Sequence, residues 1–121
     1  MAKDDYNVLV YKILLYAYAV FKRKIVFDEK EFELSIIKGG IDKDYLINIL
    51  VLMQNDGLIS GLKFRKVWGG QMLLINDFSE MKITSNGINY LTDNSKMQQV
   101  KEFILESIDI FAPLIKLVLP M

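Results

Sequence analysis

The sequence predicts a single α+β domain, in which three helices precede a β-hairpin and a further helix closes the chain. Its length of 121 residues is close to that of the commonest single domain, and hydrophobic residues make up 52% of it. Apolar residues recur at helical spacing in the first half, whereas Leu58 to Phe78 alternates apolar and polar residues around Gly69-Gly70. We expect one domain over residues 1–121, with a core at about 5–91, a C-terminal helix at about 95–112 and an apolar tail at 113–121.

The composition excludes several classes of site. The chain has no cysteine and no histidine, which removes disulfides, thiolate nucleophiles and the usual zinc sites. Fifteen basic residues balance fifteen acidic ones, so no overall field draws the protein to nucleic acid or to an anionic membrane. The sequence shows neither a nucleophile–base pair nor a glycine-rich phosphate loop. We therefore expect no enzymatic activity, no metal site and no other cofactor.

The first helix is expected from Asp5 to Phe21, a segment without Gly or Pro. Apolar residues surround its axis, so we expect other elements to cover it from more than one side. Acidic residues precede this stretch and Lys22-Arg23-Lys24 follows it, which is the reverse of the order in a signal peptide. Lys12 interrupts the stretch, which is also too short to cross a bilayer. We therefore expect a cytoplasmic protein that does not bind a membrane.

Capping residues predict where the next two helices begin. After a short extended piece at 24–27, Asp28 and Glu31 form a D-x-x-E pattern typical of a capping box, and Gly39-Gly40 is expected to end that helix. Asp42 is expected to cap a third helix, which runs to Asp56 and stops at Gly57. Capping also explains the close spacing of the carboxylates in these segments without a catalytic or metal-binding role.

The second half of the chain changes to a strand pattern and then returns to helix. We expect two antiparallel strands joined at Gly69-Gly70, a short strand at Met81 to Thr84, and a short helix from Ser85 to Leu91. Ser95 with Gln98 forms an S-x-x-Q capping box that predicts the start of the last helix. Pro113 is expected to kink or end that helix.

The order of three helices and a two-stranded hairpin is that of a winged helix. The passage from Tyr45 to Ile59 resembles the third-helix-into-strand passage of such domains, and Ile83 to Leu91 resembles the I-T-x-x-G-x-x-Y-L that often follows the wing. From about Tyr6 to about Glu106 the chain resembles the YjcQ family of small bacterial and prophage winged-helix proteins. The resemblance implies a winged helix with a three-helix core, a two- or three-stranded β-wing and an added C-terminal helix. It also implies a cytoplasmic, prophage-associated setting and a link to DNA, but it carries over no catalytic residue.

In a winged helix the exposed face of the third helix usually enters the major groove of DNA. With Tyr45 and Ile49 facing the core, the outward residues here are expected to be Lys43, Asp44, Ile47, Asn48, Val51, Gln54 and Asn55. The DNA-binding candidates among them are Lys43, Asn48, Gln54 and Asn55. One lysine against one aspartate offers little attraction for phosphate, and Ile47 with Val51 fits a contact with a protein partner equally well.

The hairpin carries the better candidates for binding nucleic acid. Lys63, Arg65 and Lys66 precede the glycine-tipped turn and Gln71 follows it, a composition that suits contact with phosphate or with the minor groove. The alternative is a solvated edge whose cations discourage strand pairing. Trp68 is expected to cover the core or to anchor a partner. The second basic cluster, Lys22 to Lys24, is explained by the dipole of the first helix unless it shares a face with the hairpin.

The last helix carries an apolar stripe that must be buried, formed by Val100, Ile104, Ile108, Phe111 and Ile115. This stripe meets the apolar first helix either in the same chain or across a homodimer, and we take it as the candidate dimer interface. Two functions follow from the sequence. One is a dimeric winged helix that binds DNA weakly or regulates transcription, and the alternative is a protein-interaction module that does not bind DNA.

Overall fold

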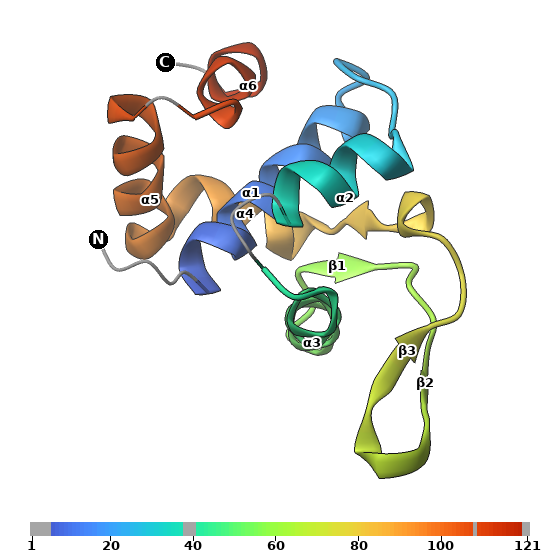
Figure 1. The fold of residues 1–121 in the computed structure, drawn as a ribbon. Coiled ribbons are helices and arrows are strands. Elements are labelled where there is room, and N and C mark those ends of the chain that lie inside the picture. Colours follow the sequence, from blue (N-terminus) through green and yellow to red (C-terminus); the bar gives the residue numbers. More distant parts are fainter. Residues whose placement is uncertain (1–5, 38–40, 108, 120–121) are drawn as a thin grey trace.

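The computed structural model describes residues 6–37, 41–107 and 109–119. These residues form six α-helices and two small antiparallel sheets of two strands each, which confirms the α+β class. The helix α1 (Tyr6–Phe21) lies at the centre, with the other helices around it, and the hairpin of β2 and β3 projects away from the body (Figure 1). Within the described residues, no helix combines the length and the hydropathy that a membrane span requires.

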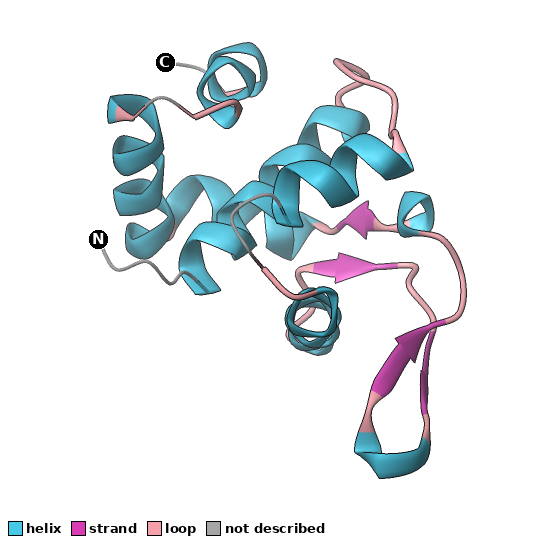
Figure 2. Cartoon of the chain, viewed as in Figure 1, coloured by secondary structure: helices cyan, strands magenta, loops and turns pink. Residues whose placement is uncertain are grey.

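The elements follow the expected order, and Figure 2 shows the short strands on one side of the helices. The remaining helices are α2 (Glu29–Ile37), α3 (Lys43–Asn55), α4 (Ser85–Asp93), α5 (Ser95–Glu106) and α6 (Phe111–Val118). The strands are β1 (Ile59–Ser60), β2 (Phe64–Lys66), β3 (Met72–Leu74) and β4 (Lys82–Ile83), with a tight turn at Trp68–Gly70 and a 3₁₀ turn at Phe78–Glu80. The extended piece expected at 24–27 forms no strand.

The helix α1 is buried on nearly every side, which confirms that other elements cover it from more than one side. The buried residues run along the whole helix and comprise Leu9, Val10, Tyr11, Ile13, Leu14, Leu15, Tyr16, Ala17 and Ala19. Five helices and β4 pack against it, and the largest contacts are those with α5 and α6. A helix without a polar side is stable in water only under such a cover.

The start of α2 follows the expected cap only in part. The Asp28 carboxylate accepts a hydrogen bond from the Glu31 backbone N–H at 3.0 Å, as an N-cap should. In a capping box the Glu31 side chain would accept the Asp28 N–H. Here that N–H donates instead to the hydroxyl of Tyr16 on α1, at 3.1 Å. That hydroxyl in turn donates to the Glu31 carboxylate at 3.2 Å. The first turn of α2 is therefore fixed to α1. The expected stop at Gly39-Gly40 lies outside the described residues.

The strands between α3 and α4 form two separate ladders. In the first, β1 pairs with β4, and in the second β2 pairs with β3 in a register that places Arg65 opposite Leu73. The expected hairpin is thus present, with Gly69 and Gly70 at φ of 84° and 82° in its turn. The long strand expected from Leu58 is interrupted at Gly61, whose φ is 93°. A Cβ there would collide with the Glu80 carbonyl oxygen.

The last helix is divided in two, contrary to the single helix expected at 95–112. The helix α5 ends at Glu106 and α6 begins at Phe111, whose N–H donates to the Asp109 carboxylate at 2.8 Å. Pro113 does not cause this break, because it occupies the first turn of α6, where no backbone N–H is needed. The residue expected to cap α5 was also wrong by one position. The side chain of Asn94, not that of Ser95, accepts hydrogen bonds from the N–H groups of the first turn.

The apolar stripe that was expected to form a dimer interface is buried within the same chain. Val100, Ile104, Phe111 and Ile115 are each at most 3% exposed, and α5 and α6 pack against α1. Ile108 lies outside the described residues. Of the two arrangements that the sequence left open, the structure therefore has the intramolecular one. This removes the reason for expecting a dimer through these residues.

Removing a buried side chain from α6 tests its packing on α1. We expect Ile115→Ala to lower the free energy of unfolding by about 2–5 kcal/mol, because Ile115 is fully buried and its loss leaves a cavity. The matched variant Leu117→Ala, on the same helix but 51% exposed, should cost less than about 0.5 kcal/mol. Urea unfolding measures both, and equal losses would contradict the packing of α6.

The hydroxyl of Tyr11 is buried without a hydrogen-bond partner among the described residues, and burial raises its pKa far above the ordinary value. An unpaired buried polar group costs about 1–3 kcal/mol. We therefore expect Tyr11→Phe to raise the free energy of unfolding by about 1 kcal/mol. Tyr16→Phe is the control on the same helix, since it loses the bonds to Asp28 and Glu31 and should lower that free energy. A loss of stability in Tyr11→Phe would reveal a partner for this hydroxyl.

Candidate interaction surfaces

The exposed face of α3 agrees only in part with the one expected, since Asp44, Asn48 and Asn55 are exposed as expected. Ile47 is only 5% exposed and packs where β3 approaches the helix, and Val51 is half-buried against the core. Tyr45, expected in the core, is 38% exposed, and Leu52 is 49% exposed. The strand β3 approaches α3 at Ile47, so this partner-contact candidate was wrongly expected to face solvent.

Two of the four DNA-binding candidates on α3 have structural partners. The Gln54 side chain donates to the Leu62 carbonyl at 2.8 Å and accepts from the Leu62 N–H at 3.0 Å, which fixes the segment that leads into the hairpin. The Lys43 ammonium lies 3.4 Å from the Glu33 carboxylate. Only Asn48 and Asn55 remain as exposed polar candidates, and Asp44 is exposed beside them. This face therefore offers little to a phosphate backbone.

The basic residues of the hairpin are exposed as the sequence predicts. Lys63, Arg65 and Lys66 all face solvent, and none of them forms an ion pair within the described part of the chain. Trp68 at the turn is 97% exposed, so it does not cover the core. Gln71 is half-buried beside it, and its carbonyl accepts the Val67 N–H at 2.8 Å. We call this element, residues 63 to 74, the basic hairpin.

The second basic cluster does not join the basic hairpin. The Lys22 ammonium donates to the Val118 carbonyl at 2.7 Å, near the end of α6, and lies 5.1 Å from the centre of the Tyr18 ring. The connection from α1 to α2, which carries Lys22 to Lys24, and the basic hairpin lie at opposite ends of the molecule (Figure 1). The cations therefore do not converge on one footprint around α3.

A hollow of about 400 Å³ lies between α2, α3 and β3, and we call it the acidic groove. Four carboxylates and one ammonium surround it, from Glu29, Glu33, Asp44, Asp77 and Lys43. Apolar side chains lie between them, chiefly those of Ile47, Met72, Leu74 and Phe78. No sequence pattern singled this groove out, because its residues come from segments that lie far apart in the chain.

The four carboxylates of the acidic groove differ in their partners. The Glu29 carboxylate accepts the Ser79 N–H at 2.6 Å, and Glu33 pairs with Lys43. Asp44 and Asp77 are exposed, and their side chains have no hydrogen bond or ion pair within the described residues. No group of acidic side chains in the described part of the chain converges as a metal site would require. The two free aspartates are thus available to a cationic partner.

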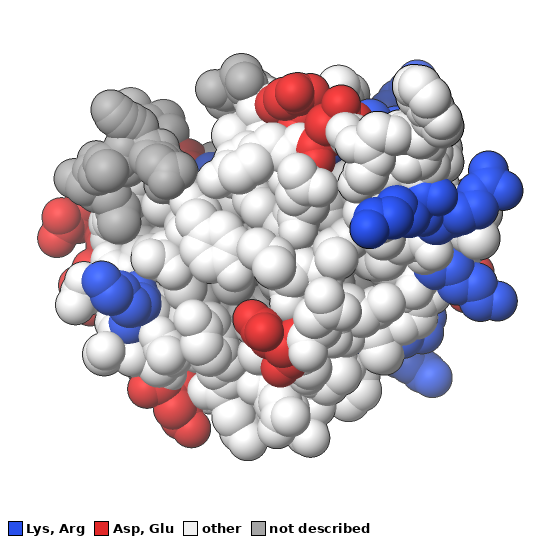
Figure 3. All heavy atoms as spheres, turned by 90° about the horizontal axis from the view of Figure 1, so that it is seen from below, with Lys and Arg blue, Asp and Glu red and all other residues white. Residues whose placement is uncertain are grey.

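Figure 3 shows the face that carries α3 and the basic hairpin. Basic side chains gather along one edge of this face, on the side where the hairpin lies in Figure 1. The middle of the face is largely uncharged and contains an acidic patch. Positive and negative regions therefore lie next to each other on this face, although the chain as a whole is neutral.

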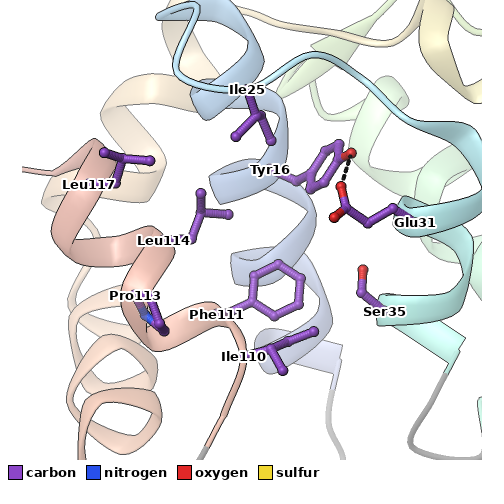
Figure 4. A pocket seen from close by; sticks show the side chains of 9 residues that line it. All are labelled: Tyr16, Ile25, Glu31, Ser35, Ile110, Phe111, Pro113, Leu114 and Leu117. Carbon is purple, nitrogen blue, oxygen red and sulfur yellow. Dashed lines mark hydrogen bonds between the residues drawn. The ribbon is translucent and has the colours of Figure 1, made fainter.

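A second hollow of about 270 Å³ separates α6 from α2, above α1, and we call it the apolar groove (Figure 4). Its lining is mostly apolar, with Ile25, Ile110, Phe111, Pro113, Leu114 and Leu117. The polar side chains that line it have hydrogen-bond partners within the chain. Tyr16 donates to Glu31, and Ser35 donates to the Phe32 carbonyl at 3.1 Å. Burial raises the pKa of Tyr16, so its hydroxyl remains a donor at neutral pH.

Removing the Gln54 side chain tests its role in positioning the basic hairpin. We expect Gln54→Ala to cost about 1–3 kcal/mol of unfolding free energy, because it leaves both backbone groups of the buried Leu62 without partners. The Leu62 amide should then exchange its hydrogen faster. Asn55→Ala, the exposed neighbour, is the control and should change neither quantity. If the Leu62 amide exchanges at an unchanged rate, Gln54 does not hold this segment.

Comparison with known proteins identifies one family. The family model described as YjcQ protein matches residues 11–110, which is most of the chain. This match confirms the resemblance that the sequence shows from about Tyr6 to about Glu106. Neither a curated protein nor a solved structure matches this chain.

Proposed function

The chain belongs to the YjcQ family, and we propose that it is a non-enzymatic protein-interaction module whose binding surface is the acidic groove. One observation carries this proposal: Asp44 and Asp77 are exposed and have no side-chain partner in the described part of the chain, and they lie beside apolar side chains in the hollow between α2, α3 and β3. The proposal includes the cytoplasmic, prophage-associated setting that the family resemblance implies.

The order of elements supports a winged-helix topology as part of the proposal. Three helices precede β1, the hairpin β2–β3 and β4, and the hairpin would be the wing. In such a domain the third helix and the wing both approach the phosphate backbone of DNA. Here the hollow between these two elements carries four carboxylates and one lysine. Phosphates would be repelled at that position, whereas a cationic protein segment would be attracted.

The exposed face of α3 also favours a protein partner. Tyr45 and Leu52 are exposed there, next to Asn48 and Asn55. Aromatic and aliphatic side chains with neutral amides are typical of protein interfaces, whereas DNA-reading helices need cations for the backbone. This face lies on the same helix as Asp44, so one partner can contact both.

The chemistry of the acidic groove defines the partner that it fits. Met72, Leu73 and Leu74 offer apolar contacts, and Asp44 and Asp77 supply negative charges that are free within the described residues. A segment that carries Lys or Arg together with one or two large apolar side chains satisfies both. Since the aspartates are exposed, the charges contribute mainly to association rate and specificity, and the buried apolar side chains contribute most of the affinity.

A labelled peptide of alternating lysine and leucine tests the acidic groove directly by fluorescence anisotropy. We expect binding that weakens with salt and falls about tenfold in the double variant Asp44→Lys with Asp77→Lys, which is ~1.4 kcal/mol. The matched control is Asp93→Lys with Glu102→Lys, which makes the same change in total charge on α4 and α5. A peptide with glutamate in place of lysine should not bind. Equal affinity for both double variants would show that the peptide responds only to total charge.

The exposed cations of the basic hairpin favour DNA binding as a second candidate function. Lys63, Arg65 and Lys66 have no acidic partner within the described residues, so they are free for phosphates. Titration with duplex DNA at low salt separates the two functions. DNA binding that is lost when these three cations become alanine, and strengthened in Asp44→Lys with Asp77→Lys, would favour DNA over the protein partner.

A further inference from the structure

We propose that the segment bound in the acidic groove is the basic hairpin of a second copy of this chain, so that two copies form a symmetric homodimer. The inference rests on the proposed function, because it names the partner of the same groove. It differs from the dimer expected from the sequence, whose interface residues on α5 and α6 are buried in the monomer.

The basic hairpin has the composition that the acidic groove requires. Arg65 and Lys66 are exposed and unpaired within the described residues, and Trp68 beside them is 97% exposed. Trp68 has the most exposed side chain among the large hydrophobic residues of the described chain. Tryptophan and arginine are the residues that most often dominate the binding energy of interfaces. A cation pair beside an unburied tryptophan thus matches free aspartates beside apolar side chains.

Within one chain, the basic side chains of the hairpin do not pair with the aspartates of the acidic groove. Its strand β3 supplies one wall of the acidic groove through Met72, Leu73 and Leu74. Its turn projects away from the body (Figure 1), and a Cβ at Gly69 or Gly70 would meet no atom within 4 Å. The complementary charges of one chain therefore remain apart, and a second copy can bring them together.

The basic hairpin and the acidic groove lie next to each other in the chain's structure, which allows a symmetric dimer in which both hairpins and both grooves are in contact. When the hairpin of one copy enters the groove of the other, a two-fold axis brings the second hairpin to the first groove. Each copy then contributes both halves of the contact, which closes the assembly at two copies. The equal numbers of acidic and basic residues mean that no net charge opposes the association.

Trp68 is the single tryptophan of the chain, so its fluorescence reports docking of the hairpin. At low salt we expect its emission to shift to shorter wavelength as protein concentration rises, in parallel with a doubling of mass by light scattering. High salt should reverse both changes. Trp68→Ala should weaken dimerisation by about tenfold or more. An emission maximum and a mass that stay unchanged over the whole concentration range would overturn the proposal.

Charge exchange between hairpin and groove tests which surfaces meet. Arg65→Glu with Lys66→Glu makes the hairpin acidic, and Asp44→Lys with Asp77→Lys makes the groove basic. Each double variant alone should be monomeric, because its own hairpin and groove carry charges of the same sign. An equal mixture should restore the dimer, since both contacts are then between opposite charges. Restoration in the mixture also shows that neither variant is misfolded.

The remaining outcomes separate this inference from the proposed function. If the lysine–leucine peptide binds the groove but the protein stays monomeric, the interaction module stands and the second copy is excluded. If neither associates, both proposals fail. A dimer that survives both charge reversals but is lost in Ile110→Ser with Leu117→Ser would place the contact at the apolar groove and overturn the hairpin contact.

Discussion

The burial of α1 is the constraint on which the rest of the structure depends. A helix with apolar residues around its whole circumference must be covered on every side, and α5 and α6 contribute the largest part of that cover. The two cations that border the buried face fix α6 in place. Lys12 pairs with Asp109 at 3.0 Å, just before α6 begins, and Lys22 donates to the Val118 carbonyl near its end. The C-terminal helices are therefore part of the core and not an appendage to it.

This use of α5 and α6 determines which surfaces remain free. The apolar stripe on these helices is buried within the chain, while α3 and the basic hairpin lie on a different side of α1 (Figure 1). Gln54 holds the segment before the hairpin to α3, so the two elements keep a fixed relation. Since Gln54 and Lys43 serve the fold, this helix loses two of the polar groups that a DNA-reading helix would present. The free charges of the region lie instead on the hairpin and on Asp44 and Asp77.

Local signals predicted most elements, and the errors arise where tertiary contacts decide. The cap at Asp42, the helix stop at Gly57 and the turn at the paired glycines depend mainly on local backbone geometry. The sequence was therefore sufficient to predict these helix ends and this turn. The expected exposure of Tyr45 and Ile47 was wrong because apolar residues occupy most positions from Tyr45 to Met53, and only packing against β3 selects Ile47 as a buried residue. The division between α5 and α6 carries no glycine or proline, and it coincides with Asp109, whose partner Lys12 is distant in the chain. The acidic groove could not be found for the same reason, although Glu29 and Glu33 share one side of α2 at a spacing of one turn.

The neutral composition of the chain conceals a separation of charge that bears on every candidate function. Free cations on the hairpin and free aspartates in the groove lie in neighbouring regions, so DNA and a cationic protein segment would each be attracted to one region and repelled by the other. Both kinds of binding weaken with salt, and salt dependence alone therefore does not distinguish them. Replacing Asp44 and Asp77 by lysine does distinguish them. A basic groove attracts phosphate and strengthens DNA binding, whereas it repels a cationic segment and weakens the binding of a protein partner. Under the proposed function the acidic groove is the region that binds, because apolar side chains surround its aspartates and add contacts that only a protein segment would use.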